Sequence, residues 1–175
     1  MTISPRIRRM TLIAAAAFAL GSGAFAAAAP AHAQGQSSCA WYNNVIQNGG
    51  IWETTTPGVQ AFSFYEGVTF PYTGYVTCDF ANGMSTELTM QGDGNFVFYA
   101  SNGKKWGSNT RPNGRDAEFQ SDGNLVVRDT YGTALWASNT HTYRNAVLSF
   151  QDDGNLVIYK SSSDFTALWA TKTNS

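Results

Sequence analysis

Hydrophobic and polar positions alternate between residues 95 and 99. Phe96 and Phe98 occupy every second position, and Asn95, Val97 and Tyr99 occupy the positions between and beside them. Because successive side chains of a β-strand point to opposite faces, this alternation predicts a strand with both phenylalanines in a core. The other three side chains would form a row on the outer face. An Asp-Gly step before the strand predicts a tight turn.

The same pattern occurs three times along the chain. The second copy begins 29 residues after the first, and the third begins 31 residues after the second. A repeat of about 30 residues indicates similar units that pack together. Each copy has Gln and Asp in the turn, then Asn, Val and a final Tyr or Arg on one strand face. The matching residues are Gln91, Asp93, Asn95, Val97 and Tyr99 in the first motif; Gln120, Asp122, Asn124, Val126 and Arg128 in the second; and Gln151, Asp153, Asn155, Val157 and Tyr159 in the third.

Each copy ends on a short predicted strand that carries a tryptophan: Trp106, Trp136 or Trp169. Short strands and polar turns at intervals near ten residues indicate an all-β sandwich, barrel or prism. One unit alone could not bury both its large apolar residues and its tryptophan. We therefore expect the three tryptophans to pack together in a central core. Stacking of these rings on a sugar is the functional alternative.

The triplicated motif, with its Trp-x-Ser-Asn-Thr type of ending, resembles the bulb-type (monocot, snowdrop-like) mannose-binding lectins. The resemblance covers residues 60–175, with an opening strand expected within residues 61–70. It implies an all-β fold, the β-prism II, in which three four-stranded sheets surround a pseudo-threefold axis. Each sheet would carry a shallow sugar site on its outer face.

A sugar hydroxyl both donates and accepts hydrogen bonds, so a binding face needs carboxylate, amide and phenol groups together. The resemblance implies that the Asp and Asn positions hold the 2-hydroxyl of mannose, Gln the 3-hydroxyl and Tyr the 4-hydroxyl, while Val packs against the ring. The first and third motifs would then be complete sites. We expect the second site to be weaker or altered in preference, because Arg128 replaces tyrosine and cannot accept a hydrogen bond.

Other interpretations of the motifs explain less. Asp-Gly-Asn could merely form hairpin turns, but a turn requirement does not explain the repeated Gln and Val. Asp152 and Asp153 suggest calcium, yet Gly92 and Ser121 replace Asp152 in the other copies. A glycosidase needs two carboxylates flanking one bond, and His141 lies in a predicted turn. The sequence thus predicts a binding protein, not an enzyme, with no metal or cofactor.

The first 33 residues have the features of an export signal. Arg6, Arg8 and Arg9 precede an alanine-rich apolar run at residues 12–29, and Ala-His-Ala at residues 31–33 is a cleavage pattern. We expect a secreted, extracellular protein that begins at residue 34. An uncleaved anchor is the alternative. The paired arginines also admit a twin-arginine route, although the general secretory route fits better.

The mature chain of about 142 residues has the length of one domain. Removing three of the 11 basic residues leaves 8 against 12 acidic ones, a net charge of about −4. Nucleic acid and anionic membranes both require a basic patch, so neither is an expected partner, and no membrane insertion is expected after signal cleavage.

Residues 34–59 form a predicted N-terminal extension before the lectin domain at residues 60–175. It should contain one or two short strands that either extend the prism or cover one end of it. Cys39 and Cys78 are the two cysteines of the chain. In an exported protein they predict one disulfide, tying the extension to the first repeat. Members of the resembled family often carry their disulfide within the repeats.

The expected function is reversible binding of mannose, or of polysaccharides and glycoproteins that contain it, through several weak sites acting together. The alternative is an antibacterial or protein-interaction module on the same fold, with weak or no sugar binding. The sequence leaves a homodimer and a monomer equally open.

Overall fold

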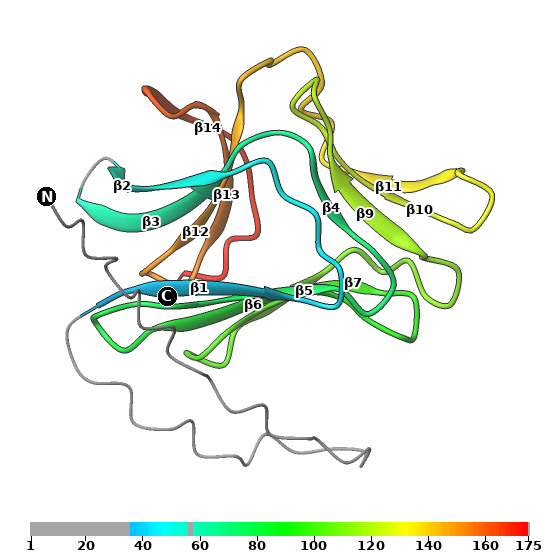
Figure 1. Cartoon of the computed structure of the whole chain (residues 1–175), viewed down its shortest axis with the longest axis horizontal. Helices are drawn as coiled ribbons and strands as arrows, with labels where there is room; N and C mark the ends of the chain where they lie inside the picture. The colour runs from blue at the N-terminus through cyan, green and yellow to red at the C-terminus, as the bar shows by residue number, and fades with distance from the viewer. Residues whose placement is uncertain (1–35, 56–57, 175) are drawn as a thin grey trace, which may run out of the picture. The chain divides into compact units, whose positions relative to one another are not determined.

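The computed structural model describes residues 36–55 and 58–174, and the predicted signal peptide at residues 1–33 lies outside them (Figure 1). Over the described residues the chain forms fourteen β-strands. None of these residues belongs to a helix that could cross a membrane.

The strands form three antiparallel sheets, which confirms the prediction of an all-β fold with three sheets. In spatial order, sheet 1 contains β1 (Ser38–Tyr42), β5 (Tyr75–Asp79), β6 (Ser85–Met90), β7 (Phe96–Ala100) and β8 (Lys105–Gly107); sheet 2 contains β11 (Ala134–Ala137), β10 (Leu125–Arg128), β9 (Asp116–Phe119) and β4 (Val68–Phe70); sheet 3 contains β14 (Asp164–Ala170), β13 (Leu156–Ser161), β12 (Val147–Gln151), β3 (Val59–Phe64) and β2 (Gly50–Thr55).

The prediction of four strands in every sheet is correct only for sheet 2. Sheets 1 and 3 each have five strands, because β1 and β2 of the N-terminal extension pair with their edges. An unpaired sheet edge exposes N–H and C=O groups that an additional strand can satisfy. The extension therefore widens two sheets instead of covering one end. The predicted disulfide between Cys39 and Cys78 is present and joins directly paired residues of β1 and β5.

The predicted opening strand is divided between two sheets. β3 and β4 follow one another in the chain, yet β3 pairs with β12 in sheet 3 and β4 pairs with β9 in sheet 2. Each thus supplies a strand to a different repeat. This arrangement joins β3 and β4, which precede the first motif, to the third and second repeats.

One hydrophobic core lies between the three sheets. Phe96 and Phe98 are fully buried in it, as their alternation predicted. The indoles of Trp106, Trp136 and Trp169 pack against this core and contact one another edge to face, with ring centroids 4.9, 5.1 and 5.6 Å apart. The predicted packing of the three tryptophans is confirmed, although each ring stays partly exposed.

Candidate functional site

The turn of each motif is held by its own aspartate. In the first motif the Oδ1 atom of Asp93 accepts a 3.0 Å hydrogen bond from the backbone N–H of Asn95. Asp122 and Asp153 accept the matching bonds at 3.0 and 2.9 Å. One carboxylate oxygen of each aspartate is therefore structural, and the other, Oδ2, is available for a different partner.

The asparagine of each motif is held by the segment that follows the tryptophan strand. The Oδ1 atom of Asn95 accepts hydrogen bonds from the hydroxyl of Ser108 and the backbone N–H of Thr110, both at 3.3 Å. The other two asparagines have the same arrangement. The Oδ1 atom of Asn124 accepts hydrogen bonds from Ser138 and Thr140, and that of Asn155 accepts them from Thr171 and Thr173. The Trp-x-Ser-Asn-Thr ending thus fixes the orientation of each asparagine amide. The Nδ2 donor of Asn95 makes no hydrogen bond within the described residues.

The first motif lines a groove of 390 Å³ on the outer face of sheet 1. Gln91, Asn95, Val97 and Tyr99 all contribute to its wall, so the structure brings four of the five predicted side chains together. The Nε2 atom of Gln91 donates a 2.9 Å hydrogen bond to the hydroxyl of Tyr99. Hydrogen-bond donors, hydrogen-bond acceptors and a small apolar surface therefore line one groove.

Asp93 stands at the rim of this groove beside an arginine that the sequence analysis missed. Its Oδ2 atom lies 3.4 Å from Nη1 of Arg111, and both side chains are well exposed. Lys105, Asn109 and Trp106 also line the groove. Lys105 lies directly opposite Tyr99 in the β7–β8 pairing. That register could have identified Lys105 from the sequence, since the hairpin length sets it.

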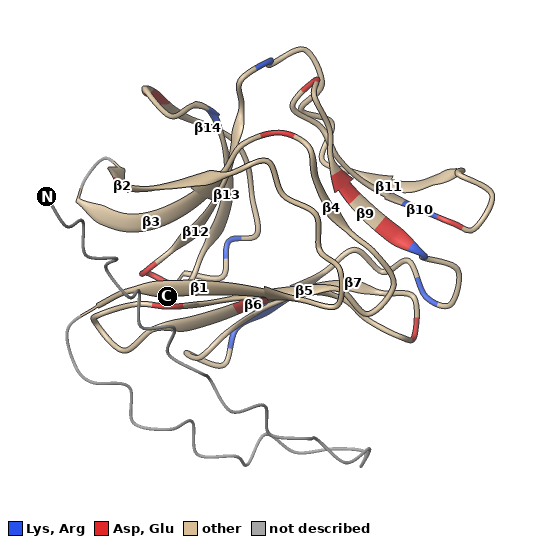
Figure 2. Ribbon diagram, viewed as in Figure 1, with Lys and Arg blue, Asp and Glu red and all other residues tan. Residues whose placement is uncertain are grey.

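The arginine of the second motif forms an ion pair. Nη1 of Arg128 lies 2.9 Å from Oε2 of Glu118 on the neighbouring strand β9, and both are partly buried. Figure 2 shows the acidic residues of β9 next to β10. Burial raises the pKa of Asp116, which faces Arg128 in the strand pairing, and the guanidinium partly opposes that rise. The side chain of Gln120 makes no hydrogen bond within the described residues, unlike Gln91.

The third motif has the same polar pair as the first but is more enclosed. Nε2 of Gln151 donates to the hydroxyl of Tyr159 at 2.8 Å. The ring of Phe165 lies 5.5 Å from that of Tyr159 and packs against the same cluster as Val157. Tyr159 is consequently only 8% exposed, whereas Tyr99 is partly exposed. The valines of the two motifs are nearly equally buried, with Val97 at 4% and Val157 at 2%. A sugar ring would have to displace Phe165 to reach Tyr159.

No cluster of ligands suggests metal chemistry. Over residues 36–55 and 58–174, no three His, Cys, Asp or Glu side chains lie close enough together to hold an ion. His141 is exposed in a turn, as predicted.

Comparison with known proteins agrees with these features. The chain is 40% identical over 91 residues to the mannose-specific lectin of Aloe arborescens, across half of this chain and 79% of that protein. It is 37% identical over 89 residues to mannose-specific lectin 2 of Colocasia esculenta, but covers only 31% of that longer protein. No family model matches the chain.

A solved structure shows the same fold. The monomeric monocot mannose-binding lectins from Gastrodia elata align with a TM-score of 0.52 and 32% identity, over 65% of this chain and 98% of theirs. Lectins bind carbohydrates without catalysis, which agrees with the prediction that the chain is not an enzyme. The threefold motif, the three antiparallel sheets and these similarities together show that the chain belongs to the bulb-type lectin family.

Proposed function

We propose that the protein binds mannose or mannose-containing glycans, chiefly through the groove of the first motif. The observation that carries this proposal is the meeting of Gln91, Asn95, Val97 and Tyr99 in one open groove. The relatives from Aloe arborescens and Colocasia esculenta, which are named as mannose-specific, support it.

The groove offers each kind of contact that a pyranose requires. Val97 provides an apolar surface for the C–H face of the ring. The Nδ2 atom of Asn95 is a donor and the Oδ2 atom of Asp93 an acceptor, so one hydroxyl could bond to both. Gln91 keeps its Oε1 acceptor after its amide nitrogen has bonded to Tyr99. The fixed turn already orients these groups, which lowers the entropic cost of binding.

A shallow groove with few hydrogen bonds gives weak binding of a monosaccharide, with a Kd on the order of 1 mM. Stronger attachment would require several sites to engage one polymer. The second and third motifs are expected to contribute less, because Arg128 is paired in one and Phe165 covers the other.

Asn95→Asp tests the first groove with little disturbance of the turn. The substitution keeps the Oδ1 acceptor for Ser108 and Thr110 but replaces the Nδ2 donor by an acceptor. Loss of that hydrogen bond should weaken retention on mannan-agarose about tenfold, and free mannose should elute the unmodified protein. Asn124→Asp, in the second motif, is the matched control and should change retention little.

Near-UV circular dichroism of both variants should resemble that of the unmodified protein. Equal retention of Asn95→Asp and the unmodified protein would exclude the first groove as the main site. An unmodified protein that mannan-agarose does not retain would favour the alternative function, a protein-interaction module.

We also propose that the protein is exported and loses residues 1–33. The disulfide between Cys39 and Cys78 supports this proposal, because disulfides persist mainly in oxidising compartments. Expression of the full chain in a secreting host should release a protein whose N-terminal residue is Gln34. Recovery of the intact chain from the membrane fraction would instead indicate an uncleaved anchor.

A further inference from the structure

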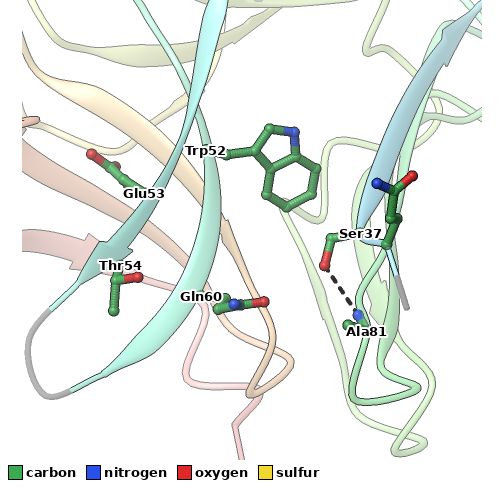
Figure 3. Close-up of a pocket in the computed structure, with 7 residues that line it drawn as sticks. Ser37, Trp52, Glu53, Thr54, Gln60 and Ala81 are labelled. Atoms are coloured by element: carbon green, nitrogen blue, oxygen red, sulfur yellow. Dashed lines mark hydrogen bonds between the residues drawn. The ribbon is translucent and has the colours of Figure 1, made fainter. Parts of the chain in front are cut away.

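A second, larger cleft lies beside the turn of the third motif, where the N-terminal extension meets sheets 1 and 3 (Figure 3). Its volume is 630 Å³, compared with 390 Å³ for the groove of the first motif. The residues that line it come from the segment just before β1, from β2 and β3, and from the turn after β5: Gln36, Ser37, Trp52, Glu53, Thr54, Gln60 and Ala81.

Trp52 forms the aromatic wall of this cleft. Its indole is braced by Phe62 and Phe80, with ring centroids 5.1 and 5.9 Å away. The side chain is nevertheless 41% exposed. β2 is an edge strand of sheet 3, so its core-facing residue has neighbours on one side and solvent on the other. Figure 3 shows the ring directed into the space between β2 and the segment that carries Ser37.

The remaining wall is polar and uncharged. Thr54 pairs with Gln60 across β2 and β3, on the sheet face that also carries Trp52. Among the described residues of the lining, Glu53 alone is charged, and its carboxylate points away from Trp52, to the other side of β2 (Figure 3). There it accepts a hydrogen bond from the hydroxyl of Ser63. The cleft therefore presents amides and hydroxyls beside an aromatic face.

Contacts between distant segments hold the cleft in shape. The hydroxyl of Ser37 accepts a 3.0 Å hydrogen bond from the backbone N–H of Ala81. The side-chain amide of Asn82 donates to the carbonyl of Asp152 at 2.8 Å, and the N–H of Asp152 donates to the carbonyl of Gln60 at 2.9 Å. The disulfide of Cys39 anchors β1 close by. A ligand would thus find the walls already in place.

We propose that this cleft is a second carbohydrate-binding site, which takes a neutral pyranose of a glycan. The exposed indole face would stack on the C–H face of the sugar ring. The amides and hydroxyls of Gln60, Thr54 and Gln36 would bond to its hydroxyls. An apolar peptide fits worse, because it would strip water from these polar groups without replacing the hydrogen bonds. This proposal is independent of the proposed function of the first motif.

Nuclear magnetic resonance of side-chain N–H groups tests both sites in one titration. The indole N–H of Trp52 reports on the cleft and the side-chain amide of Asn95 on the groove of the first motif. Trp52→Phe and Asn95→Asp assign the two signals. Titration with mannotriose and with cellobiose, both neutral, should shift the Trp52 signal in a saturable manner with at least one of them.

Two matched glutamine variants separate the sites. Gln60→Ala should weaken the response of Trp52 about fivefold, the loss of about one hydrogen bond, and leave that of the Asn95 amide unchanged. Gln91→Ala should have the reverse effect. A Trp52 signal that neither sugar shifts, or a shift that Gln60→Ala leaves unaltered, would overturn the proposed cleft site even if the Asn95 amide responds. A response of Trp52 without any response of the Asn95 amide would support the cleft and contradict the function proposed for the first motif.

Discussion

The side-chain amide of Gln151 donates a 3.4 Å hydrogen bond to the hydroxyl of Thr55, 96 residues earlier in the chain. This contact joins the third motif to β2, the strand that the N-terminal extension adds to sheet 3. Gln91, at the matching position, also donates a hydrogen bond to a tyrosine hydroxyl, but it makes none to β1 within the described residues. The added strand β2 therefore contacts one motif, and β1 makes no such bond to the other, although the two motifs have the same five residues.

Phe165→Ala should open the third groove. Removal of the ring exposes Tyr159, so isothermal titration calorimetry with a mannose ligand should show additional binding capacity. The stability cost should stay below the roughly 3 kcal/mol of a fully buried phenylalanine, because Phe165 is partly exposed. Tyr131→Ala, at a side chain that is 92% exposed, is the control and should change neither property. Unchanged stoichiometry in Phe165→Ala would show that the ring is not the barrier.

Gly94→Ala should destabilise the protein more than Gly103→Ala. Both glycines have positive φ angles, 84° and 85°, so both alanines incur backbone strain of about 1 kcal/mol. A Cβ atom at Gly94 would also lie 2.7 Å from the carbonyl carbon of Pro112, whereas nothing lies within 4 Å of one at Gly103. Urea unfolding should give a loss of at least about 2 kcal/mol for Gly94→Ala. Equal losses would indicate that the Pro112 loop moves aside.

Reduction or serine replacement of Cys39 and Cys78 should lower the free energy of unfolding by about 4 kcal/mol. The bond closes a loop with a sequence separation of 39, and this value follows from the entropy of closing such a loop. β1 should loosen from β5, which urea unfolding and amide hydrogen exchange would both detect. Exchange in β7, at the centre of sheet 1, is the internal reference. Faster exchange there than in β1 would contradict this account.

Glu87→Gln should stabilise the protein near neutral pH. Burial raises the pKa of Glu87 above its ordinary value of 4.5, so the folded state holds the proton more tightly than the unfolded state. Stability therefore falls as pH rises from 4.5 through the raised folded pKa. Glutamine removes this fall, and thermal unfolding from pH 4.5 to about pH 7 should show the difference.

Asp129→Asn should have the opposite effect on stability to Glu87→Gln. Hydrogen bonds to the carboxylate, first among them that from the backbone N–H of Thr133, lower the pKa of Asp129. This group stabilises the folded state above its unfolded pKa, and the contribution is lost as pH falls through the folded value. The asparagine variant should therefore be less stable near neutral pH. A loss of stability near neutral pH in both variants would show that burial is not the dominant effect at Glu87.

Local patterns in the sequence determined the repeated unit. The alternation around Phe96 and Phe98 predicted which face enters the core, because adjacent strand residues point to opposite sides. The spacing of the three motifs predicted three similar units, and the turn residues predicted the hairpins. The three sheets followed from the resemblance to a known family. The sequence alone also showed that the second motif differs from the other two. Arg128 stands there in place of tyrosine, and this one substitution changes the hydrogen-bonding groups on the same face.

Tertiary structure alone decided where the extension lies and which motif it contacts. β1 and β2 attach to sheet edges through backbone hydrogen bonds, which any extended segment can make and which leave no local signature. The same long-range pairing brings Thr55 to Gln151 and places Trp52 beside Gln60 and Ser37. Identical motifs thus acquire different surroundings because strands from distant parts of the chain meet only after folding.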